Sequence, residues 1–310
     1  MPGPSFKSCR KRRISDRKDD AQMDKNAQLR QLLARPGVLM APGCHDALGA
    51  RMIEEAGFSV AYMTGNGVSA SMAGVPDAGL LTMTEMVDQA RRIASAIDIP
   101  LICDADTGYG GIQNVMRTVR EFEEAGVSGI HLEDQTVPKR CAAMEGLKLV
   151  SMQAAVGRIE AALEARRSKD FLIIARTDAR ATHDLEEAIR RGKAFAKAGA
   201  DLVFLELLRS EEEAEFVVRS LHAPLMIDMM PYPGCQRMRL EKLEGLGYKL
   251  AIYPLSSTLL YAQATLQFMQ ALHHSREEGE FLPRMMPLRE YEKLLGLEEV
   301  DAAAKKFEAR

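Results

Sequence analysis

The chain has 310 residues, of which 46% are hydrophobic and 27% are charged, and its formal net charge is −3 at pH 7. These values are typical of a folded globular protein and argue against a basic surface for nucleic acid. No apolar run approaches the roughly 18 residues that a membrane span requires. The five cysteines are scattered and form no C-x-x-C pair, so we expect free thiols and a cytoplasmic location.

The first 26 residues form a segment of unusual composition. A basic cluster covers residues 7–13, a mixed run of charges follows it, and few apolar residues interrupt either one. Such a segment cannot bury enough apolar surface to order itself, and it lacks the apolar core of a secretory signal. We therefore predict a disordered basic extension over residues 1–26. A nuclear-targeting or nucleic-acid-binding tail is the less favoured interpretation.

Short β-like runs alternate with amphipathic helical stretches from about residue 37 onward. The predicted strands cover residues 38–40, 60–63, 100–103, 129–132, 171–175, 202–205, 224–227 and 250–253. The predicted helices after them cover residues 47–56, 84–97, 114–125, 151–167, 185–198, 211–221, 236–246 and 259–273. Eight such units predict a parallel (β/α)8 barrel of the TIM type, which we assign to residues 27–275. We expect residues 276–310 to form a helical tail on the barrel or on a neighbouring subunit.

Polar side chains stand at the carboxyl ends of the predicted strands. They are Thr64, Asp104, Asp106, Glu133, Asp134, Arg176, Asp178, Glu206 and Asp228. Any one of them could simply cap the next helix, because Asp and Thr accept hydrogen bonds from a helix amino terminus. The acids among them recur on five strands in a row, which favours a shared site, since these ends meet on the face where such barrels place their active sites.

The stretch from Asp104 to Gly111 is the most informative part of the chain. Asp104 and Asp106 lie two residues apart, where the apolar run 99–103 enters a glycine-rich loop. Two carboxylates this close raise each other's pKa unless a cation compensates them. Hard divalent ions prefer oxygen ligands, and a second acidic strand end follows at Glu133. The pattern predicts a Mg²⁺ site, with Mn²⁺ as the alternative.

A possible nucleotide motif lies after the second predicted strand. Residues 65–70 match the G-x-G-x-x-A pattern of dinucleotide-binding folds. That fold needs a helix directly after the turn, whereas the turn residues 74–79 interrupt the chain here. We favour a loop whose backbone N–H groups bind a substrate carboxylate.

Seven motifs follow one another in order between about residues 37 and 275. They are Pro42-Gly43-Cys44-His45-Asp46-Ala47-Leu48, Tyr62-Met63-Thr64-Gly65, Gly74-Val75-Pro76-Asp77, the Asp104–Gly110 loop, His131-Leu132-Glu133-Asp134-Gln135, Pro138-Lys139-Arg140-Cys141 and Ile174-Ala175-Arg176-Thr177-Asp178-Ala179. Together they resemble the isocitrate lyase/phosphoenolpyruvate mutase superfamily. The similarity is greatest to the branch with 2-methylisocitrate lyase, dimethylmalate lyase, oxaloacetate-cleaving enzymes and carboxyphosphonoenolpyruvate mutase.

This resemblance implies a Mg²⁺-dependent barrel, usually a homotetramer, whose subunits exchange their last barrel helix. It implies that Asp104 is the direct metal ligand and that Asp77, Asp106 and Glu133 act largely through bound waters. Several bound waters agree with the reluctance of Mg²⁺ to lose its hydration shell. The cleaved bond would leave a pyruvate-like enolate, whose negative oxygen the metal stabilises.

The resemblance also implies a substrate site for a small carboxylic acid. The residues implied to bind this acid are Tyr62, Thr64, Gly65, Asn66, Arg176, Glu206 and Asp228. Among them, Arg176 would hold a carboxylate with its planar guanidinium. Cys141 is the family's candidate acid for protonating the leaving fragment. Its neighbour Lys139 belongs to the same catalytic group and, with Arg140, should favour the thiolate.

Two positions depart from the lyases of this superfamily. Cys141 is followed by Ala142-Ala143, where the lyases usually have Gly-His, and Asp228 stands where this branch commonly has Asn. The favoured function is a carbon–carbon lyase for 2-methylisocitrate, a substituted malate or oxaloacetate. The alternatives are a phosphoenolpyruvate mutase or phosphonate-handling relative, and a weakly active or non-catalytic protein that binds keto acids.

Overall fold

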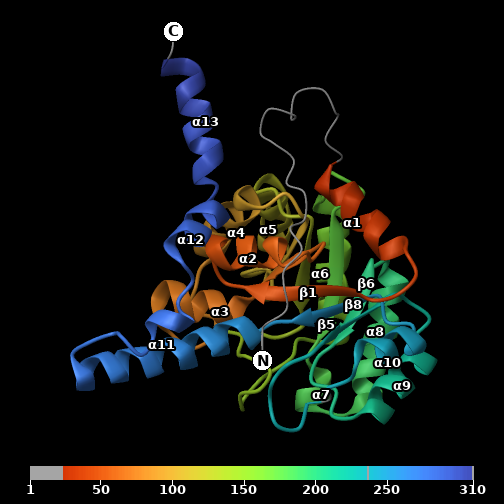
Figure 1. The fold of residues 1–310 in the computed structure, drawn as a ribbon. Helices are drawn as coiled ribbons and strands as arrows, with labels where there is room; N and C mark the ends of the chain where they lie inside the picture. Colours follow the sequence, from red (N-terminus) through yellow and green to blue (C-terminus); the bar gives the residue numbers. More distant parts are fainter. Residues whose placement is uncertain (1–23, 236, 309–310) are drawn as a thin grey trace.

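The computed structural model describes residues 24–235 and 237–308, and its centre is a closed parallel barrel in the order β1 to β8 (Figure 1). The strands are β1 (Leu39–Cys44), β2 (Ala61–Met63), β3 (Leu101–Asp104), β4 (Gly129–Glu133), β5 (Leu172–Thr177), β6 (Leu202–Leu205), β7 (Leu225–Asp228) and β8 (Leu250–Tyr253). The predicted (β/α)8 fold is confirmed.

Helices surround the barrel and continue beyond it. They are α1 (Lys25–Ala34), α2 (Ala47–Glu55), α3 (Gly65–Val68), η2 (Ser69–Ala73), α4 (Met83–Ala96), α5 (Ile112–Glu124), α6 (Met152–Ala165), α7 (Ala179–Thr182), α8 (Leu185–Ala198), α9 (Glu211–Ser220), α10 (Leu240–Leu246), α11 (Ser256–Ser275), η3 (Leu282–Arg284), α12 (Leu288–Leu295) and α13 (Leu297–Glu308). No helix among the described residues is long and apolar enough to cross a membrane.

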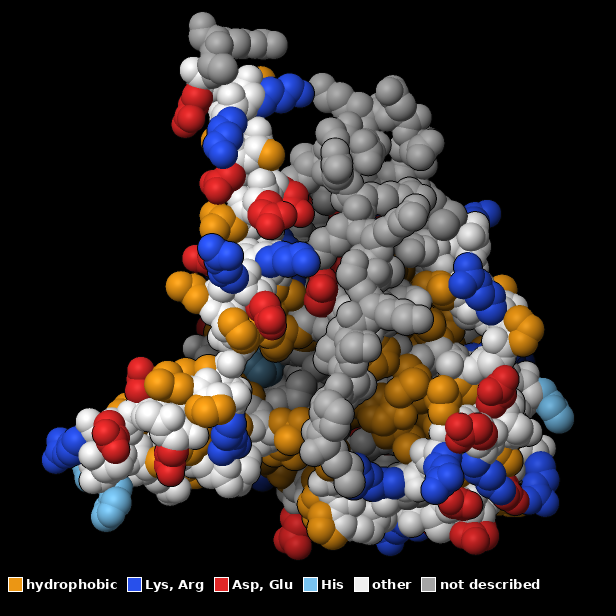
Figure 2. Space-filling view, viewed as in Figure 1, with side chains coloured by type: hydrophobic (Ala, Val, Ile, Leu, Met, Phe, Trp, Pro, Cys, Tyr) orange, Lys and Arg blue, Asp and Glu red, His pale blue; other side chains and the backbone are white. Residues whose placement is uncertain are grey.

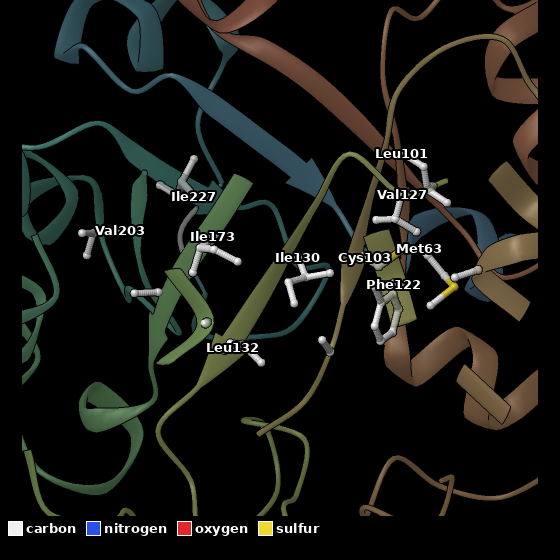
Figure 3. Packing of buried hydrophobic residues seen from close by; sticks show 14 of the residues in the cluster. Met63, Leu101, Cys103, Phe122, Val127, Ile130, Leu132, Ile173, Val203 and Ile227 are labelled. Carbon is white, nitrogen blue, oxygen red and sulfur yellow. The ribbon is translucent and has the colours of Figure 1, made fainter. Parts of the chain in front are cut away.

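The barrel has two apolar clusters, one inside the ring of strands and one between the strands and the surrounding helices. The inner cluster includes Ile102, Ile174 and Phe204, and alternate residues such as Cys103 and Ile173 belong to the outer cluster. Successive side chains of a strand point to opposite faces, so each strand contributes side chains to both clusters. Figure 3 shows part of the outer cluster, where strand side chains pack beside Phe122 of α5.

Helix α1 covers the end of the barrel where the strands begin. Leu29 is buried in the inner cluster, and the Lys25 ammonium donates to the carbonyl oxygens of Ala94 and Ile97 at 3.0 and 2.6 Å. This helix begins two residues inside the segment predicted to be an extension, and residues 1–23 lie outside the described part of the chain. The sequence analysis had not identified α1.

The carboxyl-terminal helices extend away from the barrel. Helix α12 contacts α2, where Leu294 is buried and its carbonyl oxygen accepts from Arg51 Nη1 at 3.2 Å. Helix α11 projects sideways in Figure 1, and Thr258 is its one buried residue. Apolar side chains line this projecting arm, as the orange atoms of Figure 2 show. The exposed ones are Leu259, Leu260, Tyr261, Leu266 and Met269.

An ion-pair network ties α1 to the barrel. Asp201, just before β6, accepts from Arg30 Nη2 at 2.8 Å and from Arg166 Nη1 at 2.6 Å. Its carboxylate also accepts from the backbone N–H of Ile173 at 2.8 Å. Only 10% of the Asp201 side chain is exposed. The network therefore fixes two elements through one carboxylate.

We predict that Asp201→Ala lowers the free energy of unfolding by about 2–3 kcal/mol, because it leaves two partly buried arginines and one backbone N–H without their acceptor. Urea denaturation followed by circular dichroism measures this change. Asp170→Ala is the matched control, since that carboxylate is half exposed and lies 3.9 Å from the same Arg30. The control should change stability by less than about 1 kcal/mol. Equal effects of the two substitutions would contradict the network's role.

Candidate active site

The alternation of side chains along the strands brings polar groups together at the barrel mouth. On β5, Leu172 and Ile174 face the inner cluster, so Arg176 continues the same series. The same step of two leads from Ile102 to Asp104 on β3 and from Phe204 to Glu206 after β6. The side chains that line the mouth therefore lie on the same face of their strands as the inner cluster.

A pocket lies at this mouth. Its walls are formed by Tyr62, Thr64, Asn66, Asp77, Asp104, Cys141, Arg176, Phe204, Glu206, Asp228, Met230, Ile252, Pro254 and Leu255. Nine residues of the predicted site line it. Gly65, Asp106, Glu133 and Lys139, which were also predicted, are not part of its wall.

The apolar part of the pocket wall was missed by the sequence analysis. It consists of Phe204, Met230, Ile252, Pro254 and Leu255. Phe204 and Ile252 could have been found from the alternation, because both lie in the inner series of their strands. Met230 and Leu255 follow their strands, where this alternation no longer applies.

Asp104 is the most strongly ionised acid of the pocket. Its Oδ1 accepts from the backbone N–H of Asp106 at 3.0 Å and lies 3.7 Å from His131 Nδ1. Burial alone would raise the pKa of Asp104, but His131, Lys139 and Arg176 outweigh burial and lower it to about 2. Asp104 is therefore charged at neutral pH.

Gly65 lies directly against this carboxylate. A Cβ atom at position 65 would stand 2.6 Å from Asp104 Oδ2, closer than side chains approach one another in proteins. The absence of a side chain therefore lets α3 begin beside Asp104. Thr64 caps this short helix by accepting from the backbone N–H of Gly67.

His131 and Tyr62 form a buried layer beneath the pocket. The Tyr62 hydroxyl and His131 Nε2 are hydrogen-bonded at 2.8 Å, and neither side chain is appreciably exposed. Burial lowers the pKa of His131 to about 4, so the ring is neutral at pH 7. The layer can orient Asp104 without adding a positive charge to it.

Lys139 is buried between two of the predicted metal-site acids. Its ammonium forms ion pairs with Asp77 and, at 2.8 Å, with Asp106 Oδ1. Burial works against the charged amine, but Asp106 and Asp77 outweigh it and raise the pKa of Lys139. The loop after β4 is thus attached to the mouth by a buried cation, which the sequence analysis had placed beside Cys141.

Arg176 binds three acids at the centre of the mouth. Its guanidinium donates to Asp178 Oδ1, with Nη2 at 2.9 Å, while its Nε lies 3.5 Å from Glu133 and 3.7 Å from Glu206. The strand register places Glu133 directly opposite Arg176. Asp178 in turn accepts from the Gln135 amide at 3.0 Å. The arginine fork is held rigidly while its residue still lines the pocket.

Glu133 has the least satisfied carboxyl group of the site. Both of its oxygens are buried without a hydrogen-bond partner among the described residues. Burial raises the pKa of Glu133 well above its usual range. A buried carboxyl group without hydrogen-bond donors suits a hydrated cation, whose waters would donate to it.

A metal would depend mostly on water for its ligands. Within residues 24–235 and 237–308, no three His, Cys, Asp or Glu side chains are arranged to hold an ion by themselves. The resemblance assigns the direct ligand to Asp104, and bound waters would have to supply most of the others. Mg²⁺ usually retains several water ligands when it binds to proteins. The residues present therefore fit the implied ion.

Glu206 and Asp228 form a carboxyl pair on the opposite side of Arg176. Burial raises the pKa of Glu206, and it raises that of Asp228 to about 6 against the opposing effects of Arg176 and a hydrogen bond from Glu206. Because Glu206 and Asp228 interact, the two carboxyl groups titrate as a pair. Position 228 is an acid that can be charged or neutral near physiological pH.

Cys141 lines the pocket from the loop after β4. Its backbone N–H donates to the Asp77 carbonyl oxygen at 2.9 Å. Burial and then Asp77 raise the pKa of its thiol to about 11. The prediction that Lys139 would favour the thiolate is wrong, because the Lys139 ammonium is paired with Asp77 and Asp106. Cys141 therefore carries a proton at neutral pH.

Gln135 and Asp134 hold this loop in place, although the sequence did not identify that role. The Gln135 amide donates to the Arg140 carbonyl oxygen at 2.8 Å and accepts from the Arg140 N–H at 2.9 Å. Asp134 is out of phase with the inner series and accepts from Thr177 and Arg191. One acid of the Glu133-Asp134 pair thus serves the site and the other serves the scaffold.

Comparison with known proteins agrees with this geometry. Residues 29–273 match the phosphoenolpyruvate phosphomutase family model. A 2,3-dimethylmalate lyase of Eubacterium barkeri is 43% identical over 278 residues, which cover 90% of this chain and 96% of that protein.

Solved structures give the same result. Oxaloacetate acetylhydrolase in complex with 3,3-difluorooxalacetate has a TM-score of 0.86 at 35% identity, covering 91% of this chain and 97% of that one. Phosphonopyruvate hydrolase in complex with oxalate and Mg²⁺ has a TM-score of 0.83 at 32% identity, covering 92% and 99%. The predicted resemblance is confirmed, and the chain belongs to the isocitrate lyase/phosphoenolpyruvate mutase superfamily.

Proposed function

We propose that this carbon–carbon lyase uses Mg²⁺, or Mn²⁺, to cleave a small 2-hydroxy or 2-keto di- or tricarboxylic acid. The candidate substrates are a substituted malate, 2-methylisocitrate and oxaloacetate. One observation carries the proposal: an ionised Asp104 on the pocket wall, in the same mouth as the buried carboxyl group of Glu133, whose oxygens have no hydrogen-bond partner among the described residues. A solved relative with oxalate and Mg²⁺ in its structure supports the choice of ion.

The metal would be held directly by Asp104 and through waters by Asp77, Asp106 and Glu133. When bound, it would supply a Lewis acid that stabilises negative charge on the C2 oxygen of the substrate, which becomes the carbonyl oxygen of the pyruvate-like product. Lys139 already neutralises part of the charge of Asp77 and Asp106. These four acids could therefore bind a divalent ion without placing four uncompensated carboxylates side by side.

The substrate would be bound through its carboxylates. Thr64 and Asn66 line the pocket beside the amino terminus of α3, and Gly65 lets the backbone of this turn approach Asp104 closely. Arg176 offers a planar donor fork from the opposite wall, which suits a second carboxylate. Tyr62 closes the bottom of the pocket with its hydroxyl bound to His131.

Two residues of the pocket wall are assigned to the proton transfers. Asp228, with a pKa of about 6, is largely ionised at pH 7 and can accept the proton of the substrate hydroxyl. Cys141 carries a proton with a pKa of about 11 and can donate it to the carbon of the leaving fragment. Ala142-Ala143 leave the thiol without the histidine that related lyases place nearby.

The chain would act as a cytoplasmic homotetramer. Its organisation comprises the extension 1–26, the catalytic barrel 27–275 and the tail 276–310. The apolar side chains on α11 support an assembly in which this helix packs on a neighbouring copy, because exposed apolar patches of this kind usually mark protein contacts.

The function is tested by incubating the purified protein with Mg²⁺ and each candidate acid while pyruvate, glyoxylate and oxalate are measured. We expect cleavage of at least one acid, its loss on addition of EDTA, and its recovery with excess Mg²⁺. Asp104→Asn should abolish both turnover and calorimetric Mg²⁺ binding, while Asp88→Asn, an exposed control on α4, should change neither. Turnover that survives EDTA and Asp104→Asn would refute the metal-dependent mechanism.

We predict that Cys141→Ser lowers kcat by about 10²–10⁴-fold, because a serine hydroxyl is a far weaker acid than a thiol. Binding of oxalate in the presence of Mg²⁺ should be unchanged, since the thiol is not assigned to the metal or to the carboxylates. Steady-state kinetics and calorimetry measure the two effects. Unchanged turnover would remove Cys141 from the mechanism.

For the assembly, we predict that the double variant Leu260→Asp/Met269→Asp elutes as a smaller species than the parent protein in size-exclusion chromatography with light scattering. Both charges would enter the apolar contact proposed for α11. Phe216→Asp on α9 is a control with a similarly exposed apolar side chain and should leave the mass unchanged. A monomeric parent protein would contradict the tetramer.

A further inference from the structure

A second cavity lies beside the substrate pocket. It is lined by Ala142, Ala143, Ala181, Leu207, Arg209, Tyr232, Pro233, Gly234 and Cys235. It encloses about 770 Å³ of space, including its opening to solvent, compared with about 400 Å³ for the pocket at the mouth. Nothing in the proposed mechanism uses this space.

The two cavities share the same stretches of chain. The loop after β4 gives Cys141 to the pocket and the next residue, Ala142, to the cavity. The segment after β6 gives Glu206 to the pocket and Leu207 to the cavity. The shared segments make the cavity the neighbour of the wall that carries Cys141.

The segment after β7 makes a third connection between them. Met230 lines the pocket, and Tyr232 and Cys235 line the cavity. Burial, then Asp228 and Glu206, raise the pKa of the Cys235 thiol, so Cys235 lies within electrostatic range of these two pocket acids. The side cavity therefore lies next to the part of the pocket wall that contains Cys141.

The walls of the side cavity are mainly apolar and made of small side chains. Three alanines, Leu207 and Pro233 contribute no side-chain polar group, and Arg209 is the one charged residue among those that line it. Arg209 is exposed to solvent. On the pocket side, Glu206 and Asp228 disfavour a second negative charge passing between the two spaces. The walls therefore favour a hydrocarbon group over a carboxylate.

We propose that the side cavity binds an alkyl arm carried by the substrate carbon that Cys141 protonates. The inference rests on the proposed function and names its substrate class, a malate with an alkyl substituent of two or more carbons at C3. The arm would project past Cys141 over Ala142 and Ala143.

A series of 3-alkylmalates tests the proposal, from unsubstituted malate to 3-methyl, 3-ethyl and 3-propylmalate, with the parent protein and Mg²⁺. We expect kcat/KM to rise about fourfold for each added methylene, as burial of one methylene group predicts. Ala181→Leu, which fills the cavity from α7, should abolish this rise while leaving kcat/KM for malate within about twofold. Ala143→Leu, which fills it from the loop, should have the same effect.

Ala34→Leu adds the same side chain at an exposed position on α1, at the far end of the barrel, and should preserve the whole series. A flat or falling series in the parent protein would overturn the proposal, as would filling variants that weaken all malates equally. If the protein cleaves unsubstituted malate or oxaloacetate but kcat/KM does not rise with alkyl length, the alkyl site is rejected and the proposed lyase function stands. If no acid is cleaved at all, the proposed function fails and the inference fails with it.

Discussion

The barrel mouth depends on the compensation of buried negative charge. Among the described residues, the buried acids at this mouth are Asp77, Asp104, Asp106, Glu133, Asp178, Glu206 and Asp228, against two buried cations, Lys139 and Arg176. Burial raises the pKa of Glu133 and Glu206 and so favours their neutral forms. A divalent cation would favour the ionised forms, because it stabilises carboxylates that burial disfavours. Protons and a divalent metal ion would therefore compete for these carboxyl groups.

Lys139 links this charge balance to the position of the thiol. Its ion pairs with Asp77 and Asp106 fix the loop two residues before Cys141, and the backbone of Cys141 binds the Asp77 carbonyl. Gln135 holds the same loop from its other side through Arg140. Electrostatic compensation therefore also serves to place the proposed proton donor against the substrate space.

Much of this arrangement could be predicted from the sequence. Eight alternating units predicted the barrel, and strand ends such as Asp104 and Arg176 were recognised because side-chain alternation has a fixed period. Helix α1 was missed, since its role depends on Leu29 fitting the open end of the barrel, a contact between distant residues. The protonation of Cys141 was also mispredicted, because sequence proximity to Lys139 says nothing about which acids that lysine binds. The side cavity depends on three separate loops and leaves no pattern in any one of them.

The contact between Gly65 and Asp104 limits how this chain can change over evolutionary time. Any residue other than glycine at position 65 would collide with a carboxylate from a different strand. Shortening the partner offers no escape, because aspartate is already the smallest side chain that carries a carboxylate. A larger residue at position 65 would require the Asp104 carboxylate to move, so a change at either position has to be accommodated at the other.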